Sequence, residues 1–150
     1  MEKFMNAAQC FTVANTLALL GWILMLFAPR WEGTKKLIHQ GLLPILLGLA
    51  YVIILVSTWG TAEGGFGSLS DVRKLFSNDW ALLAGWIHYL AFDMFVGSWC
   101  LQDSWKRGIH HLWMVPIMVL TFLFGPTGLL IYGAMRFFRP DHHEQIPNNG

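Results

Sequence analysis

Charged residues are scarce in this chain and unevenly placed. Of its 150 residues, 13% are charged and 55% are hydrophobic, which is far from the balance of a soluble domain of this size. Three long stretches carry no charge and a fourth carries only Asp93; they cover residues 9–28, 41–61, 112–135 and 81–101. Each is long enough to cross a bilayer as a helix. The scarcity of charge leaves no room for a separate soluble domain and predicts an all-α integral membrane protein.

Cysteine is also rare, and the net charge is small. Two cysteines, Cys10 and Cys100, are too few for a disulfide framework or a metal cluster, and we interpret them as small packing residues. A net charge of +1 argues against a nucleic-acid partner. The sequence has no P-loop and no dinucleotide-binding fingerprint. We therefore expect no metal and no other cofactor.

The apolar stretches predict a four-helix transmembrane bundle that forms one domain over residues 1–150. The expected helices cover residues 7–28, 41–59, 80–101 and 112–137, and a loose tail follows at 140–150. The longest connection, residues 60–78, either lies on the membrane surface or forms a lid. An even number of spans places both termini on one side of the membrane. Lys and Arg are then equally divided between the two sides, so the positive-inside rule does not orient the chain.

Two local features refine this bundle. Pro126 should kink the last helix at Gly125–Pro126, because proline has no amide hydrogen and leaves the Phe122 carbonyl without its helical donor. A stripe of small residues in the first helix suits close helix contact and would also suit self-association into a homo-oligomer. This stripe consists of Ala14, Ala18 and Gly21.

The third helix carries two ionisable groups in the stretch Trp86–Gly97. His88 and Asp93 lie near its middle, where an ionisable group costs at least a few kcal/mol and is a functional candidate by default. An apolar stripe on this helix is predicted to face lipid, and it consists of Leu83, Ile87, Leu90, Met94 and Leu101. His88 and Asp93 then flank the opposite arc about 140° apart, where they could reach the two ends of one reacting group.

Polar features of all four helices fall at a similar predicted depth. We predict that Asp93 and His88 exchange protons with a substrate held near the midplane. Asp93 should stay protonated, because burial disfavours its charged form and the acid can donate to the freed carbonyl. The residues predicted to hold the substrate are Asn15, Tyr51, Trp86, Phe122, Gly125 and Pro126. The alternative is that these groups only hold the helices together.

Metal and haem chemistry are less favoured by the histidine pattern. His39, His110 and His111 share one predicted surface and could bind a metal, but adjacent loop histidines are more often solvated. Haem held by two histidines needs both at one depth, and His88 is the only histidine inside a predicted span. No Ser-His-Asp or Cys-His arrangement can be proposed from the sequence.

Several residue blocks carry a family resemblance that extends to about Arg139. They are Asn15, Trp22, Pro29 and Trp31; Trp86, His88, Phe92, Asp93, Gly97 and Asp103; and Pro116, Phe124–Leu130 and Tyr132. Together they resemble the neoxanthin-synthase-like family of small four-helix membrane proteins, named for an abscisic-acid-deficient plant line. The resemblance implies a membrane isomerase acting on a carotenoid, a xanthophyll or a related isoprenoid lipid. An epoxide would open to an alcohol while a neighbouring proton leaves to form an allene, with no redox cofactor.

The alternative function is a non-catalytic carotenoid- or lipid-binding membrane subunit, followed by a haem or quinone carrier. The expected partners are a hydrophobic small molecule and the membrane itself. The chain shows no Ser- and Arg-rich transit segment. We therefore expect a bacterial inner membrane, or the plastid envelope for a processed plant form.

Overall fold

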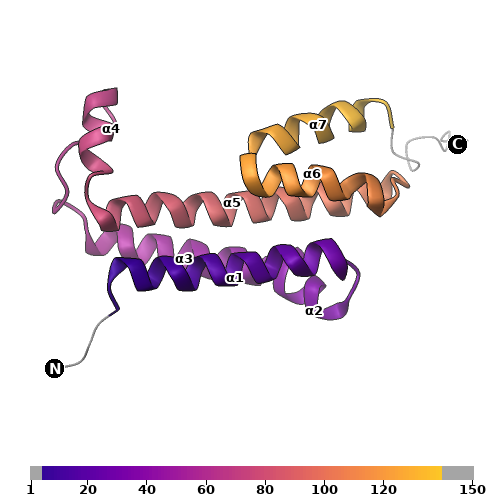
Figure 1. The fold of residues 1–150 in the computed structure, drawn as a ribbon, viewed down its shortest axis with the longest axis horizontal. Helices are drawn as coiled ribbons and strands as arrows, with labels where there is room; N and C mark the ends of the chain where they lie inside the picture. Colours follow the sequence, from indigo (N-terminus) through magenta and orange to yellow (C-terminus); the bar gives the residue numbers. More distant parts are fainter. Residues whose placement is uncertain (1–4, 140–150) are drawn as a thin grey trace, which may run out of the picture.

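The structure, a computed structural model, describes residues 5–139, and every regular element in that range is helical (Figure 1). The predicted loose tail over residues 140–150 lies outside the described residues. The elements are α1 (Ala7–Phe27), α2 (Glu32–Thr34), the π-helical η1 (Lys35–His39), α3 (Leu42–Ser57), α4 (Leu69–Leu75), α5 (Asp79–Lys106), α6 (His111–Phe124) and α7 (Pro126–Phe137).

Three runs of helix are long and apolar enough to cross a membrane. They are Ala7–Phe27, Glu32–Ser57 and Asp79–Lys106. The side chains of Asn6 and Asn78 cap the first and the last of these helices at their N-termini. The three lie side by side, and α5 is the central helix because α1, α3 and α6 all pack against it (Figure 1). The all-α membrane class predicted from the sequence agrees with this arrangement.

The predicted fourth span is instead a helical hairpin. α6 has 14 residues and α7 has 12, so each is about 20 Å long and shorter than the roughly 30 Å hydrocarbon core. The two helices pack side by side, and α7 runs back along α6 (Figure 1). The expected four-helix bundle is therefore corrected to three spans and a hairpin.

The last predicted helix breaks at Gly125–Pro126, as expected, but the chain reverses direction there instead of continuing as a kinked helix. Gly125 adopts φ +32° and ψ −88°, a backbone conformation that residues with a side chain rarely adopt. Pro126 then begins α7 at a position where its missing amide hydrogen costs nothing. A Cβ atom on Gly128 would overlap Thr121, so a glycine there lets α7 lie directly against α6.

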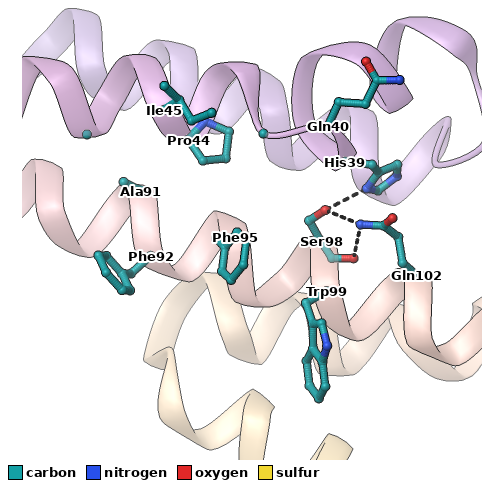
Figure 2. A pocket seen from close by; sticks show the side chains of 12 residues that line it. His39, Gln40, Pro44, Ile45, Ala91, Phe92, Phe95, Ser98, Trp99 and Gln102 are labelled. Atoms are coloured by element: carbon teal, nitrogen blue, oxygen red, sulfur yellow. Dashed lines mark hydrogen bonds between the residues drawn. The ribbon is translucent and has the colours of Figure 1, made fainter.

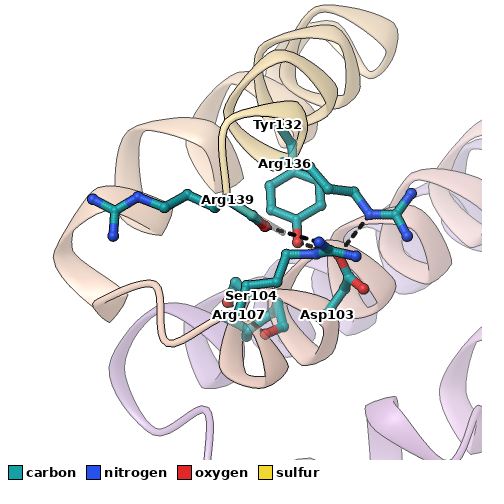
Figure 3. A network of polar contacts seen from close by, with 7 residues as sticks. Asp103, Ser104, Arg107, Tyr132, Arg136 and Arg139 are labelled. Carbon is teal, nitrogen blue, oxygen red and sulfur yellow. Dashed lines mark hydrogen bonds and ion pairs between the residues drawn. The ribbon is translucent and has the colours of Figure 1, made fainter. Parts of the chain in front are cut away.

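A polar network closes the base of the hairpin (Figure 3). Oδ2 of Asp103 on α5 accepts a hydrogen bond of 2.6 Å from the Tyr132 hydroxyl of α7. The same oxygen pairs with Nε of Arg107 at 2.8 Å and with Nε of Arg136 at 3.0 Å. Arg107 also donates to the backbone carbonyl of Arg139. The end of α7 is thus held beside the end of α5.

This network overturns the predicted topology. Arg136 and Arg139 lie on the same side as Arg107, whereas the sequence prediction placed them across the membrane from it. With three spans and a re-entrant hairpin, residues 5 and 139 lie on opposite sides. The prediction of both termini on one side is therefore wrong for the described chain.

The faces of α5 are also the reverse of the prediction. The five residues of the proposed lipid stripe are all buried, with Leu90 the most accessible at 4% and Met94 at 0%. Phe92, on the face of α5 opposite the stripe, where the prediction implies contact with protein, is 58% exposed. The physical reason is that lipid and protein core are both apolar, so hydrophobicity alone does not distinguish them.

The small-residue stripe of α1 is used inside the chain. Ala14 and Ala18 are buried, and a Cβ atom on Gly21 would lie 2.8 Å from Cε of Met94. Small side chains therefore let α1 approach α5 closely. Because the stripe is already covered, it no longer supports self-association.

Candidate functional site

The predicted site residues divide into two clusters on different sides of α5. Asp93 faces the tip of the α6–α7 hairpin. His88 faces α3, where its ring lies 5.4 Å from that of Tyr51. The two proposed acid–base groups are five residues apart on a regular helix and so point about 140° apart. The structure does not bring them together around one reacting group.

The hairpin tip meets Asp93 at the middle of α5. A Cβ atom on Gly125 would lie 2.7 Å from Oδ1 and 2.9 Å from Oδ2 of Asp93, so only glycine lets the tip come this close. Oδ2 is buried and has no hydrogen-bond partner within residues 5–139. The carboxyl group also lies at the start of α7, where the helix dipole favours negative charge.

Tyr89 belongs to this cluster, although the sequence analysis missed it. Its hydroxyl donates a hydrogen bond of 2.9 Å to the Phe122 carbonyl that Pro126 leaves free. The same hydroxyl lies beside the Asp93 carboxyl group. The Phe122 carbonyl, which we expected to accept a hydrogen bond from protonated Asp93, therefore already has a donor in Tyr89. The i,i+4 spacing of Tyr89 and Asp93 was the signal that could have revealed this.

Asn15 and Trp86, both predicted to hold substrate, bind each other. Nε1 of Trp86 donates to Oδ1 of Asn15 over 2.9 Å and so joins α5 to α1. The Trp86 ring also packs against Tyr89, with the ring centroids 5.3 Å apart. Hydrogen bonds between helices are a common way to hold membrane bundles together. This pair therefore ties α1 to α5 beside the Asp93 cluster.

The second cluster lies in a cleft between α3, α4 and α5. The cleft has a volume of about 530 Å³, within the usual range of small-molecule pockets. His88 and Tyr51 are the only titratable side chains among the residues that line it. His88 also stacks on Phe92, with ring centroids 4.5 Å apart. The cleft thus offers one imidazole and one phenol within apolar walls.

The long connection before α5, residues 60–78, supplies one wall of this cleft. The sequence had left open whether this connection lies on the membrane surface or forms a lid. Phe66 and Phe76 both line the cleft. Phe76 packs directly on α5, because a Cβ atom on Gly85 would lie 2.8 Å from its ring. The connection therefore folds against the end of the bundle as a partial cover of the cleft.

The histidines considered for a metal site make separate contacts. His39 bonds to Ser98 and to the Pro29 carbonyl, whereas His111 bonds to the Leu26 carbonyl. The ring of His110 accepts a hydrogen bond from the Leu112 amide. Among residues 5–139, no group of three or more His, Cys, Asp or Glu side chains is placed to hold a metal ion.

The apolar exterior, the three apolar spans and the half-buried polar groups on the central helix define a polytopic membrane protein with an apolar cleft. The chain belongs to the ABA DEFICIENT 4-like family, whose model matches residues 9–132. This confirms the family resemblance given by the residue blocks. The matched range includes every residue of both clusters.

A curated relative supports the same assignment. The chain is 33% identical over 132 residues to "Protein ABA DEFICIENT 4, chloroplastic" of Arabidopsis thaliana. The match covers 83% of this chain and 59% of that protein, so the chain spans about three fifths of the relative's length. The relative and the apolar helices support a membrane location, but they do not support the bacterial inner membrane in particular. No solved structure matches the chain significantly.

Proposed function

We propose that this chain is a membrane isomerase acting on a carotenoid, a xanthophyll or a related isoprenoid lipid by acid–base chemistry. The observation that carries the proposal is the cleft of about 530 Å³ in which His88 and Tyr51 face apolar walls. Membership of the family supports a carotenoid-related role. An apolar cleft of this size between membrane helices is a suitable site for part of such a molecule.

The proposed reaction needs one proton delivered and one removed. A proton goes to the epoxide oxygen as the carbon–oxygen bond breaks, and the oxygen becomes an alcohol. A proton leaves the neighbouring chain carbon, and its electron pair forms the new double bond of the allene. The product is an isomer of the substrate, so no electrons are exchanged with a cofactor. Histidine is suited to both proton transfers near neutral pH.

His88 is the proposed acid–base residue, and Tyr51 is the proposed hydrogen-bond donor to the epoxide oxygen. Both line the cleft, so both could touch a bound substrate. The apolar walls would limit the access of water, which would otherwise open the epoxide to a diol. Asp93 is proposed as a positioning residue, because its carboxyl group packs against the hairpin tip.

The test is turnover by the purified protein in lipid nanodiscs, with an epoxy-xanthophyll as substrate and product formation followed by chromatography. His88→Gln keeps the size and polarity of the side chain but cannot exchange protons at neutral pH. We expect it to lose turnover about 100-fold or more while melting near the wild-type temperature. His110→Gln, a histidine outside the cleft, is the matched control and should keep turnover. Full activity in His88→Gln would overturn the proposed role.

The alternative function is a carotenoid- or lipid-binding subunit without catalysis. The same cleft favours this alternative, because binding needs only its shape and apolar walls. Wild-type protein that carries stoichiometric carotenoid but shows no turnover would establish the alternative. A haem absorption band in the purified protein would contradict both functions and support the haem carrier.

A further inference from the structure

A second cleft lies further along the same pair of helices (Figure 2). It has a volume of about 450 Å³ and lies between α3 and α5. Most of its lining is apolar, with Pro44 and Ile45 on one side and Phe92 and Phe95 on the other. Such a lining suits a hydrocarbon ligand and not a charged one.

The two clefts follow one line along the helix pair. On α3 the lining residues Pro44, Gly48, Tyr51 and Leu55 are spaced by three or four positions and so share one face. The clefts meet at α5, where His88 of the first stacks on Phe92 of the second. Their lining on α5 extends from Ala81 to Gln102, which is about 30 Å at 1.5 Å per residue.

Gly48 leaves open space at the end of the second cleft that is nearer to the first. A Cβ atom added to this residue would meet no other atom within 4 Å, although the residue is in the middle of α3 and lines the second cleft. A glycine inside a helix lowers helix stability, by about 1 kcal/mol relative to alanine. The open space above it is the place where a ligand that fills both clefts would cross α3.

The far end of the second cleft is polar (Figure 2). Nε2 of His39 donates to the Pro29 carbonyl, so Nδ1 is left to accept from the Ser98 hydroxyl at 2.8 Å. Gln102 donates to Oγ of Ser98 at 3.2 Å. Within residues 5–139 Gln102 takes part in hydrogen bonds only as a donor, so its amide oxygen accepts none there. This end can therefore bind a hydrogen-bond donor such as a hydroxyl group.

We propose that the two clefts form one groove, hereafter the α3–α5 groove, that binds a single elongated isoprenoid with a cyclic group at each end. One end fills the first cleft, passing His88 and reaching toward Ala81, and a ring hydroxyl on the other end donates to Gln102. The groove length and its polar far end favour this two-ended molecule over a phospholipid or a quinone, which carry one polar head. The placement of the reacting end at His88 rests on the proposed function, whereas the binding of the ligand does not.

The first experiment measures binding of zeaxanthin, a dihydroxylated carotenoid without an epoxide, by the purified protein in nanodiscs. Gly48→Leu fills open space without a clash and should weaken binding at least ten-fold. Gly133→Leu is the matched control, because Gly133 is also helical, a Cβ atom there would meet nothing within 4 Å, and it lies on α7 away from the groove. Wild-type affinity in Gly48→Leu would overturn the proposal.

The second experiment compares zeaxanthin with β-carotene, which has the same polyene but no hydroxyl groups. Wild-type protein should bind zeaxanthin about ten-fold more tightly, as expected for one buried hydrogen bond. Gln102→Leu should remove this preference and leave β-carotene binding unchanged. Equal affinities for the two carotenoids in the wild type, or a preference that survives in Gln102→Leu, would contradict the assigned polar end.

Measuring both zeaxanthin binding and epoxy-xanthophyll turnover distinguishes failure of the α3–α5 groove from failure of the proposed isomerase function. Zeaxanthin binding that depends on Gly48, in a protein without turnover, would support the groove and reject the isomerase. Turnover that survives in Gly48→Leu would reject the groove while leaving the isomerase at His88 in place.

Discussion

Asp93 is the single acidic residue in the middle third of α5, and the side chains around it determine whether it can reach a substrate. Its carboxyl group packs against Gly125, and Tyr89 lies beside it. It does not line either cleft of the α3–α5 groove. A group enclosed in this way is better placed to hold the hairpin than to touch a substrate. Its expected protonated state stays a prediction.

Asp93→Asn tests this assignment, because asparagine keeps the shape of the side chain but has no titrating proton. We expect turnover within about ten-fold of wild type, since the contact with the hairpin tip remains. Asp93→Leu should lower the free energy of unfolding by about 1–3 kcal/mol, because the branched side chain does not fit the close contact with Gly125. Turnover and melting curves of the two variants distinguish a structural role of Asp93 from a proton-transfer role. A stable Asp93→Asn protein without activity would restore the proton-transfer role predicted from the sequence.

At the scale of elements, the α6–α7 hairpin depends on glycine at its tip, position 125, because a side chain there would collide with Asp93. Gly125→Ala puts a methyl group within 3 Å of Asp93 and forces alanine into an unfavourable backbone conformation. We expect a loss of about 2 kcal/mol or more in stability, seen as a lower melting temperature. Gly133→Ala is the control, because its position is open, and it should be neutral or slightly stabilising. Equal melting temperatures for the two variants would contradict the close contact at the tip.

Asp103 holds the end of α7 beside the end of α5, because one oxygen of its carboxylate accepts hydrogen bonds from Tyr132, Arg107 and Arg136. Asp103→Asn leaves two arginines without their counter-charge in a half-buried place, so we expect a loss of about 3 kcal/mol. Cys100 reports on this region, because it is fully buried one turn before Asp103. Its reaction with a thiol reagent should accelerate in Asp103→Asn but not in Lys36→Gln, which changes an exposed charge. Unchanged Cys100 reactivity would show that the network does not hold the hairpin.

At the scale of the whole molecule, the re-entrant hairpin changes how charge is distributed across the membrane. Seven basic residues now share one side, and they are Arg30, Lys35, Lys36, Lys106, Arg107, Arg136 and Arg139. Within residues 5–139, the other side has Arg73 and Lys74. The equal division expected for four spans therefore disappears, and the positive-inside rule now applies.

We predict that the side with seven basic residues faces the cytoplasm of the cell that inserts the chain. Single cysteines in a Cys10→Ala, Cys100→Ala background, labelled with a membrane-impermeant reagent, would test this. Positions 36 and 139 should react from the cytoplasmic side, and position 63 from the opposite side. Labelling of positions 63 and 139 from one side would contradict the re-entrant hairpin and restore the four-span topology.

The sequence by itself determined the all-α membrane class, three of the four spans it predicted, and the position at which the last predicted helix breaks. Long uncharged runs require helices in a bilayer because the backbone must satisfy its own hydrogen bonds there. Proline at position 126 has no amide hydrogen, so a continuous helix would lose a backbone hydrogen bond at the middle of the last apolar run. His88 and Asp93 could be singled out because ionisable groups inside a span are costly wherever they point.

Only the tertiary structure decided which face of α5 is covered, how far the chain turns at Gly125, and which polar groups meet. Lipid and protein core select the same side chains, so Leu83 and Phe92 could not be assigned to one or the other from hydrophobicity. The reversal at Gly125 depends on the contact of Gly125 with Asp93, which lies 32 residues earlier in the chain. It also depends on the contacts of Tyr132 and Arg136 with Asp103, which lies 29 and 33 residues before them. The separation of His88 from Asp93 follows from the helices packed around α5, because each neighbour covers a different side of it.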